Sequence, residues 1–376
     1  MPACRVCTFS IHSVLVCLFS FGLSGCQTIG YYAQAVNGQL AVWRAAEPID
    51  RVLENEQTDP KLRQRLVLVS EIREFASREL ELPDNNSYRR YADLKRPYVV
   101  WNVFAAPEFS LVPVRWCFPI AGCVGYRGYF SREGADKFAT RLKETGLNDK
   151  DLDVFVGGVP AYSTLGWFAD PVLNTFIGYR DAELARLIFH ELAHQVAYAK
   201  GDTMFNESFA TTVELEGVRR WLEHIGQSDQ FEAFIAGRRR QKEFLDLVTR
   251  TRERLKGIYE EDMPDEEKRS LKVGAYAQLR EEYEKLKNQW GGFSGYDRWF
   301  GDSLNNAKLG SVAAYNQLVP AFQELLAEHG GDLEPFYQAV AKLAKLTPEE
   351  RSAQLPVDAA VRSNGKLITA TRSSVN

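Results

Sequence analysis

Several features that would narrow the choice of function are scarce in this 376-residue chain. Lys and Arg number 46 against 50 Asp and Glu, which leaves a net charge of -4. This balance excludes the strong basic field that attracts nucleic acids over long range, so no DNA or RNA partner is expected. Histidine occurs only five times and cysteine six times. With 45% hydrophobic and 26% charged residues, the composition is that of a globular protein with a sizeable core.

The first 26 residues differ from the rest of the chain. Arg5 precedes an uncharged apolar stretch over residues 14–23, which is shorter than the ~20 residues that span a bilayer. Such a stretch followed by small residues is typical of a secretory signal, here residues 1–25. Leu23-Ser-Gly-Cys26 resembles a bacterial lipobox, which implies that Cys26 is acylated and becomes the mature N-terminus. The alternative is an ordinary cleaved signal with a chance cysteine.

The lipobox also indicates a compartment. Gln27 follows the cysteine where an aspartate would favour inner-membrane retention, so we expect a lipid-anchored protein of the bacterial envelope, on the outer membrane and facing the periplasm.

Only Cys117 and Cys123 of the six cysteines remain free once the signal is removed and Cys26 is acylated. The loop between them contains Pro119 and Gly122, which can bring its ends together, and the envelope is oxidising. A disulfide is favoured over two buried thiols.

The order of apolar patterns predicts an α+β protein that is predominantly helical, with a small mixed or antiparallel sheet followed by a helical body. We expect one domain over residues 26–362, with a helical part (40–82), a sheet region (98–178), metal-site helices (181–224), a long helical hairpin (229–290), C-terminal helices (302–348) and a loose tail (363–376). The expected strands are Tyr98–Phe104, Asp153–Val156 and Asn174–Ile177, and the expected helices are Arg132–Thr145, Asp181 to Gly201 with Asp181 as its cap, Asn206–Glu223, Phe231–Tyr259, Pro264–Trp290, Leu304–Glu328 and Leu333–Leu346.

One segment combines residues that hold metals. His190-Glu-Leu-Ala-His194 places two histidines four residues apart, which on a helix means one face and about 5–6 Å between Cβ atoms. Both imidazoles can therefore bind one ion. Glu191 projects to the side, where it can act as a general base on a water that zinc polarises.

A catalytic zinc needs a third protein ligand and an open fourth position. Glu207, in the first turn of the next expected helix, supplies a carboxylate if the chain folds back around Gly201. Glu214 lies two turns further along the same face, and it and Asn206 are expected to orient the ligands. Two imidazoles and one carboxylate favour Zn²⁺ over other divalent ions.

The pair His190-Glu-Leu-Ala-His-Gln and Asn206-Glu-Ser-Phe-Ala-Thr-Thr-Val-Glu214 resembles the gluzincin metallopeptidases, particularly zinc aminopeptidases. More narrowly, the chain resembles bacterial predicted aminopeptidase lipoproteins, which share the segment from Trp116 to Cys123 and the Asn-Asn-Ala segment at 305–307. The resemblance implies the same ligands and base and a gluzincin-like fold. By analogy it also suggests Tyr315 as the donor to the oxyanion, and Thr164 to Asp170 is a candidate edge strand for substrate.

The chain departs from the gluzincin pattern in two places. Only 12 residues separate His194 from Glu207, and no Gly-x-Met-Glu-Asn segment precedes the histidines. Three functions therefore stay open: a membrane-tethered zinc aminopeptidase acting on peptides, which is the leading one, a zinc endopeptidase acting on envelope proteins, and a non-catalytic metal-binding lipoprotein.

Overall fold

The computed structural model describes residues 29–118, 122–147, 151–164, 166, 168–312 and 317–355. Helices predominate and small sheets accompany them, so the predicted α+β class is confirmed. A first helix covers residues 29–45. The helices that follow are α2 (Ile49–Glu54), α3 (Pro60–Arg78), α4 (Arg132–Thr145), α5 (Asp181–Ala193), α6 (Thr203–His224), α7 (Asp229–Glu260), α8 (Asp265–Gln289), α9 (Asp297–Gly301), α10 (Asn306–Gly310), α11 (Val319–Glu328), α12 (Leu333–Leu343) and α13 (Pro348–Gln354). The strands are β1 (Ala46–Pro48), β2 (Arg90–Ala92), β3 (Val100–Pro107), β4 (Trp116–Phe118), β5 (Gly122–Val124), β6 (Arg127–Tyr129), β7 (Leu152–Val159) and β8 (Val172–Leu173).

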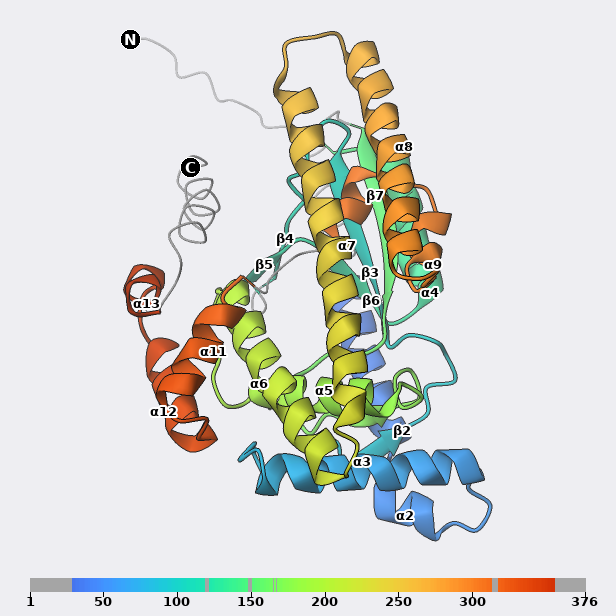
Figure 1. The fold of residues 1–376 in the computed structure, drawn as a ribbon. Coiled ribbons are helices and arrows are strands. Elements are labelled where there is room, and N and C mark those ends of the chain that lie inside the picture. Colours follow the sequence, from blue (N-terminus) through green and yellow to red (C-terminus); the bar gives the residue numbers. More distant parts are fainter. Residues whose placement is uncertain are drawn as a thin grey trace, which may run out of the picture.

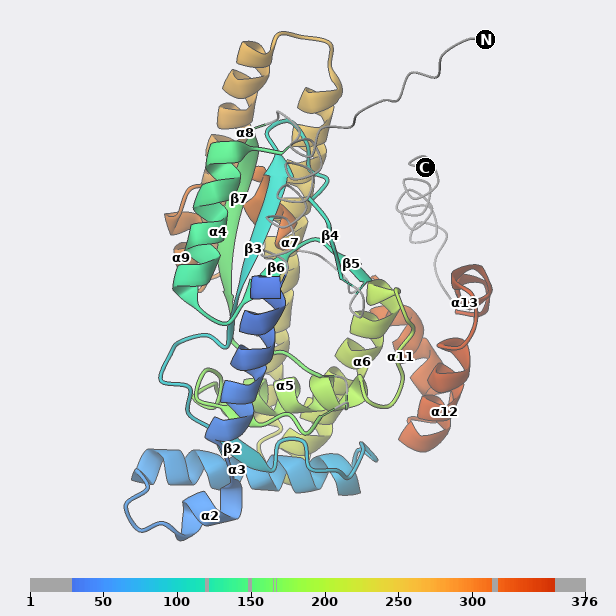
Figure 2. The ribbon, with the colours of Figure 1, turned by 180° about the vertical axis from the view of Figure 1, so that it is seen from behind.

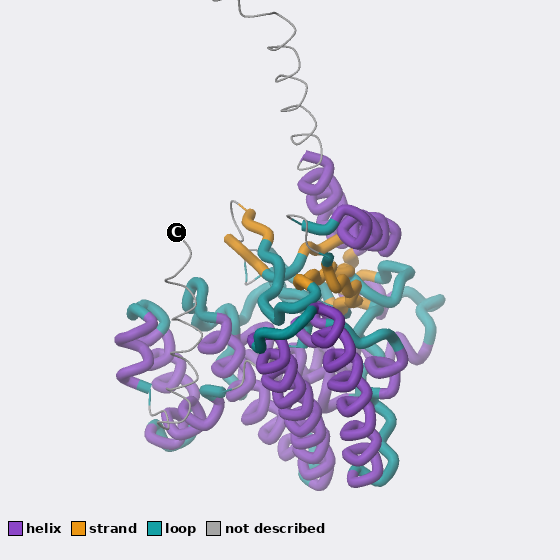
Figure 3. Tube along the Cα trace, turned by 90° about the horizontal axis from the view of Figure 1, so that it is seen from above, coloured by secondary structure: helices purple, strands orange, loops and turns teal. Residues whose placement is uncertain are grey.

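The sheet with the longest strands has the order β6-β3-β7, and both pairings are antiparallel. Helix α4 covers one face, where Ala135 and Phe138 pack against Trp101 and Val103 of β3. The pair α7 and α8 lies on the opposite side (Figures 2 and 3). Helix α4 occupies its predicted residues, and the Ser131 side chain accepts a hydrogen bond from the Gly134 amide at its start.

Two smaller sheets are also present among the described residues, with the orders β1-β2-β8 and β4-β5. Strand β1 lies within the region 40–82, which was predicted to be helical, because Ala46 to Pro48 pairs with β2. The predicted strand Asn174–Ile177 is wrong. These residues form turns, in which the Phe176 and Ile177 amides both donate to the Leu173 carbonyl. Strands β4 and β5 place Cys117 opposite Cys123, and the structure joins the two as a disulfide.

The main core lies where α3, α5, α6, α11 and α12 meet (Figure 1). Helix α3 buries Leu66, Val69 and Ile72, which recur at helical spacing and so form one apolar face. Asp59 caps it by accepting hydrogen bonds from the amides of Lys61 and Leu62. Because α5 and α6 both pack into this core, the residues on their facing sides are held in fixed relative positions.

Helices α7 and α8 lie side by side and are joined by a short connection (Figure 1). Asn306, which is fully buried, connects this pair of helices to the end of β3 in the sheet β6-β3-β7. Its side-chain oxygen accepts hydrogen bonds from the hydroxyls of Tyr259 (2.8 Å) and Tyr276 (2.7 Å), and its amide group donates to the Glu108 carbonyl (2.8 Å). The Asn-Asn-Ala segment therefore has a structural role here.

Two helix predictions are wrong in their bounds. Helix α5 ends at Ala193 instead of Gly201, and Asp181 is its first residue and pairs with Arg65 instead of capping the helix. The predicted helix Leu304–Glu328 is divided into α10 and α11.

Among the described residues, no helix combines the length and the apolar character needed to cross a membrane. The expected tail over 363–376 and Cys26 lie outside the described residues.

Candidate metal centre

Helix α5 presents its two histidines at its C-terminal end. The apolar residues Leu184, Ile188 and Leu192 bury the opposite side of the helix in the main core. His194 follows the last residue of α5, yet its amide still bonds to the His190 carbonyl and its backbone angles stay helical. The four-residue spacing therefore keeps both imidazoles on one face although the helix is shorter than predicted.

Helix α6 brings the carboxylate. Asp202 caps the helix by accepting a hydrogen bond from the Phe205 amide at 3.0 Å. Glu207 is the fifth residue of α6 and thus lies in its second turn, not in the first turn as predicted. The chain between the helices turns back tightly, with Gly201 at a φ of +81°. Such an angle is readily adopted by glycine.

The structure brings His190, His194 and Glu207 together. The two Nε2 atoms lie 3.2 Å apart, His190 Nε2 lies 3.2 Å from Glu207 Oε2, and His194 Nε2 lies 3.6 Å from Glu207 Oε1. One possible ligand atom from each residue lies within 4.8 Å of the others. Ligands at 2.0–2.1 Å from a tetrahedral ion are separated by roughly 3.3–3.4 Å, so these residues fit a zinc ion.

Glu214 fixes the tautomer of the first histidine. His190 Nδ1 donates a hydrogen bond to Glu214 Oε2 at 2.8 Å, so in the neutral imidazole the lone pair is on Nε2, which faces the other two candidate ligands. The Glu214 side chain is only 3% exposed. Burial raises the pKa of this carboxyl, but the positive charge of Arg186 and the bond from His190 outweigh that effect and hold the pKa at about 2. Glu214 is therefore an anion at neutral pH.

Two arginines compensate the charge of Glu214. Arg186, which belongs to α5, donates a hydrogen bond to Glu214 Oε2 at 2.9 Å. Arg238 of α7 lies 3.9 Å from Glu214 Oε1. Glu183 bridges the two, at 2.8 Å from Arg186 and 3.3 Å from Arg238. This charge network thus extends from the buried Glu214 at the candidate metal site to partly exposed residues of α5 and of the long helix α7.

The histidines have opposite charge tendencies in the metal-free chain. Burial lowers the pKa of His190, but hydrogen bonds with Glu207 and Glu214 outweigh it and raise the pKa to about 10. Burial and the neighbouring charge of His190 lower the pKa of His194 to about 4. At neutral pH the His190 imidazole therefore carries its second proton and a positive charge, whereas His194 is neutral. A bound cation would replace that second proton of His190.

Glu191 faces the same region with its carboxylate unbonded. It forms no hydrogen bond or ion pair with any residue in the described part of the chain. Burial raises its pKa, the charge of His190 opposes this, and the negative charges of Glu207 and Asp170 raise it further. A carboxylate without a protein partner beside a cation site can accept a proton from a water molecule.

Two loops lie against the end of α5. Gln195 accepts a hydrogen bond from Asn85 at 2.7 Å and donates to Ser87 at 3.3 Å. The predicted edge strand from Thr164 to Asp170 is wrong, because its described residues form a loop in which the Thr164 amide donates to the Asp170 carboxylate. Gly166 has a φ of +78° and packs against Gln195. No strand in the described residues of this segment is therefore available to hold a substrate.

Three other expected residues have different outcomes. Asn206 does not reach the histidines. Its side chain accepts from the Ala199 amide at 2.7 Å and donates to the Ala199 carbonyl at 2.9 Å, so it fixes the connection between α5 and α6. Tyr315 and Cys26 lie outside the described residues.

Sequence reasoning missed Arg186, Arg238 and Tyr198. Arg186 could have been found, since it lies four residues before His190 and therefore on the same face of α5. Arg238 gives no such signal because it belongs to α7. Tyr198 is 48% exposed, and its ring centroid lies 6.4 Å from that of His194, which places an exposed aromatic ring beside the candidate ligands.

The model of a protein family described as "Putative aminopeptidase" matches residues 30–355. No curated protein matches the chain, and no solved structure does. The matched range includes α5, α6 and all three residues of the candidate metal centre. Since it extends over most of the sequence, the chain belongs to this aminopeptidase family.

Proposed function

We propose that this protein is a zinc-dependent aminopeptidase that a lipid at Cys26 tethers to an envelope membrane. The observation that supports the proposal best is the convergence of His190, His194 and Glu207, whose possible ligand atoms lie within 4.8 Å of one another. The family match supports a peptidase-like activity independently of this geometry. A structural zinc usually has four protein ligands, and the described residues supply only three here, which favours catalysis.

The chain's own residues divide the work of hydrolysis. His190, His194 and Glu207 would hold the ion, and Glu214 keeps His190 in the tautomer that binds it. Bound zinc would polarise the substrate carbonyl and lower the pKa of a coordinated water to about 7. Glu191 takes a proton from the attacking water and delivers it to the departing amine. Burial strengthens these electrostatic effects, because the surroundings screen charges less than water does.

The activity is tested with the metal content and the hydrolysis of short peptides measured on the same samples. Wild type is expected to hold about one zinc per chain and to hydrolyse peptides. Glu191→Gln keeps the shape of the side chain and should retain zinc while losing roughly 10²-fold or more in kcat. A variant that retains full activity would contradict the role of Glu191, and a wild type that binds zinc without hydrolysis would contradict the peptidase proposal.

The choice of an aminopeptidase is tested with matched peptides. Each peptide is offered with a free and with an acetylated N-terminus. An aminopeptidase should cleave only the free form, from its first residue. Equal cleavage of both forms, or cleavage at internal bonds, would show an endopeptidase.

The tether needs its own measurement because Cys26 lies outside the described residues. Mass spectrometry of the mature N-terminal peptide should find Cys26 as the first residue and carrying acyl chains. Cys26→Ala should prevent this processing. An unmodified N-terminus after a conventional signal cut would contradict the tether and leave the peptidase proposal intact.

A further inference from the structure

The helix over residues 29–45 has two faces of different character. Its inner face lies along β6, where Gln34 donates to the Gly128 carbonyl at 3.2 Å and accepts from the Phe130 amide at 3.1 Å. Gly38 approaches Phe130 so closely that a Cβ there would lie 2.0 Å from the ring. The helix is thus firmly seated on the body of the protein (Figure 2), and its other face points outward.

The outer face of this helix is apolar and exposed. Ile29, Tyr32 and Val36 are 69%, 37% and 58% exposed, and their spacing of three and four residues places them on one side. No charged residue occurs between Gln27 and Trp43. Solvent-facing sides of helices normally carry charged side chains, so an uncharged face with large apolar residues indicates a surface that another apolar phase covers.

The distance from the anchor identifies that phase. Cys26 precedes Ile29 by three residues, and three residues span at most roughly 10–11 Å when fully extended. The polar region on each side of a bilayer is only about 5–7 Å thick. Acyl chains on Cys26 would therefore keep the start of the helix within the headgroup region or a few ångströms outside it.

Neighbouring groups also suit a membrane surface. The disulfide hairpin β4-β5 adjoins the helix, with the Phe118 ring centroid 6.3 Å from that of Tyr32. Arg115 next to this hairpin is exposed and can meet anionic headgroups. Tyrosine is enriched at the boundary between apolar chains and water.

We propose that the outer face formed by Ile29, Tyr32 and Val36 lies in the interfacial region of the lipid bilayer and docks the body of the protein on the membrane. The proposal rests on the tether at Cys26 as part of the proposed function. The first helix then makes a second contact with the lipid, in addition to the acyl chains. This contact fixes the orientation of the protein relative to the membrane, which an anchor at Cys26 alone would not do. This contact adds to the membrane affinity that the acyl chains supply.

The first test uses the full-length acylated protein in vesicles of phosphatidylethanolamine and phosphatidylglycerol. Acylation of Cys26 and the disulfide between Cys117 and Cys123 leave no other free thiol in the mature chain. An environment-sensitive fluorophore is attached to Ile29→Cys, Val36→Cys or the control Val67→Cys, which is 43% exposed on α3. Brominated lipids should quench the label at positions 29 and 36 but not at 67. Absence of quenching at 29 and 36, or equal quenching at all three positions, would overturn the proposal.

A second test separates the face from the anchor and from the activity. The mature chain is made without acylation, and its binding to the same vesicles is measured. Ile29→Ser combined with Val36→Ser should weaken binding by about tenfold or more, since full burial of one aliphatic side chain is worth roughly that factor, whereas Val67→Ser should have no effect. Unchanged binding by the double variant, or a soluble dimer that hides both positions and ignores vesicles, would overturn the proposal. Peptide hydrolysis and the mass of the N-terminus report on the proposed function separately.

Discussion

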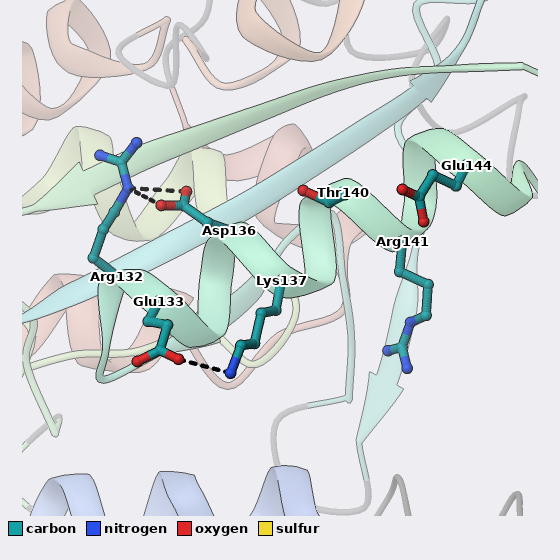
Figure 4. Close-up of a pocket in the computed structure, with 7 residues that line it drawn as sticks. All are labelled: Arg132, Glu133, Asp136, Lys137, Thr140, Arg141 and Glu144. Carbon is teal, nitrogen blue, oxygen red and sulfur yellow. Dashed lines mark hydrogen bonds and ion pairs between the residues drawn. The ribbon is translucent and has the colours of Figure 1, made fainter.

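The metal centre and the outer face of α4 contain the same kinds of charged side chain in opposite surroundings. On α4, Arg132 pairs with Asp136 at 2.8 Å and Glu133 with Lys137 at 2.6 Å, around an open depression (Figure 4). These four side chains are 48–77% exposed, whereas that of Glu214 in the metal centre is 3% exposed. Water can solvate each partner on α4 if the other is removed, so those pairs contribute little to the stability of the fold. In the metal centre each charge depends on its partner.

Of the changes considered, removal of a candidate ligand should lower the zinc affinity most. Glu207→Gln replaces the carboxylate of α6 by a neutral amide. We expect zinc affinity to fall by more than about 100-fold, because loss of an outer hydrogen-bond partner alone typically costs 10–100-fold. Competition with a fluorescent chelator measures the affinity. Retention of wild-type affinity would remove Glu207 from the ligand set.

Removing the partner of a ligand should have a smaller effect. Glu214→Gln can still accept the hydrogen bond from His190 but no longer compensates Arg186 and Arg238. Zinc affinity is expected to fall by about 10–100-fold, measured with the same chelator. An unchanged affinity would show that the buried charge network does not support the metal.

Zinc uptake should release about one proton per ion near neutral pH. Below its pKa of about 10, His190 carries a proton that Glu207 and Glu214 stabilise, whereas His194, with a pKa of about 4, is already neutral. Binding requires the unprotonated Nε2 of His190, so affinity should rise with pH across the neutral range. Calorimetric titrations in buffers of different ionisation enthalpy count the protons. Uptake without proton release would show that His190 is neutral in the metal-free protein.

The smallest effect is expected on α4. Asp136→Asn breaks the pair with Arg132 where both side chains are largely exposed. The free energy of unfolding should change by no more than about 0.5 kcal/mol, and zinc affinity should stay unchanged. Denaturant titration measures the first and chelator competition the second. A larger loss would mean that the exposed pairs matter as much as the buried ones.

The sequence predicted the convergence of His190, His194 and Glu207 because local rules determine it. Two histidines four residues apart share a helix face, and a nearby turn returns the chain so that Glu207 can reach them. Helix α4 could likewise be predicted from the sequence, because Ser131 and Gly146 are residues that typically begin and end helices. Such features depend on residues that are close together in the chain.

Other features depend on contacts between distant segments. Residues 194–199 could continue a helix by propensity, but the bonds from Asn206 to Ala199 hold them in the return path to α6. The residues Asn174 to Ile177 have strand-like composition, yet Asn174 bonds to Leu94 at 2.9 Å and to Arg96 at 3.1 Å, which directs this segment into turns. Propensity alone indicates neither outcome.

Arg238 has a consequence beyond the charge that it supplies to Glu214. It belongs to α7, which provides none of the three candidate ligands, yet it lies 3.9 Å from the carboxylate that orients His190. Any partial opening that lifts α7 from α6 would also remove one of the two cations beside this carboxylate. The rate at which the ion escapes would then report how well the long helix stays docked.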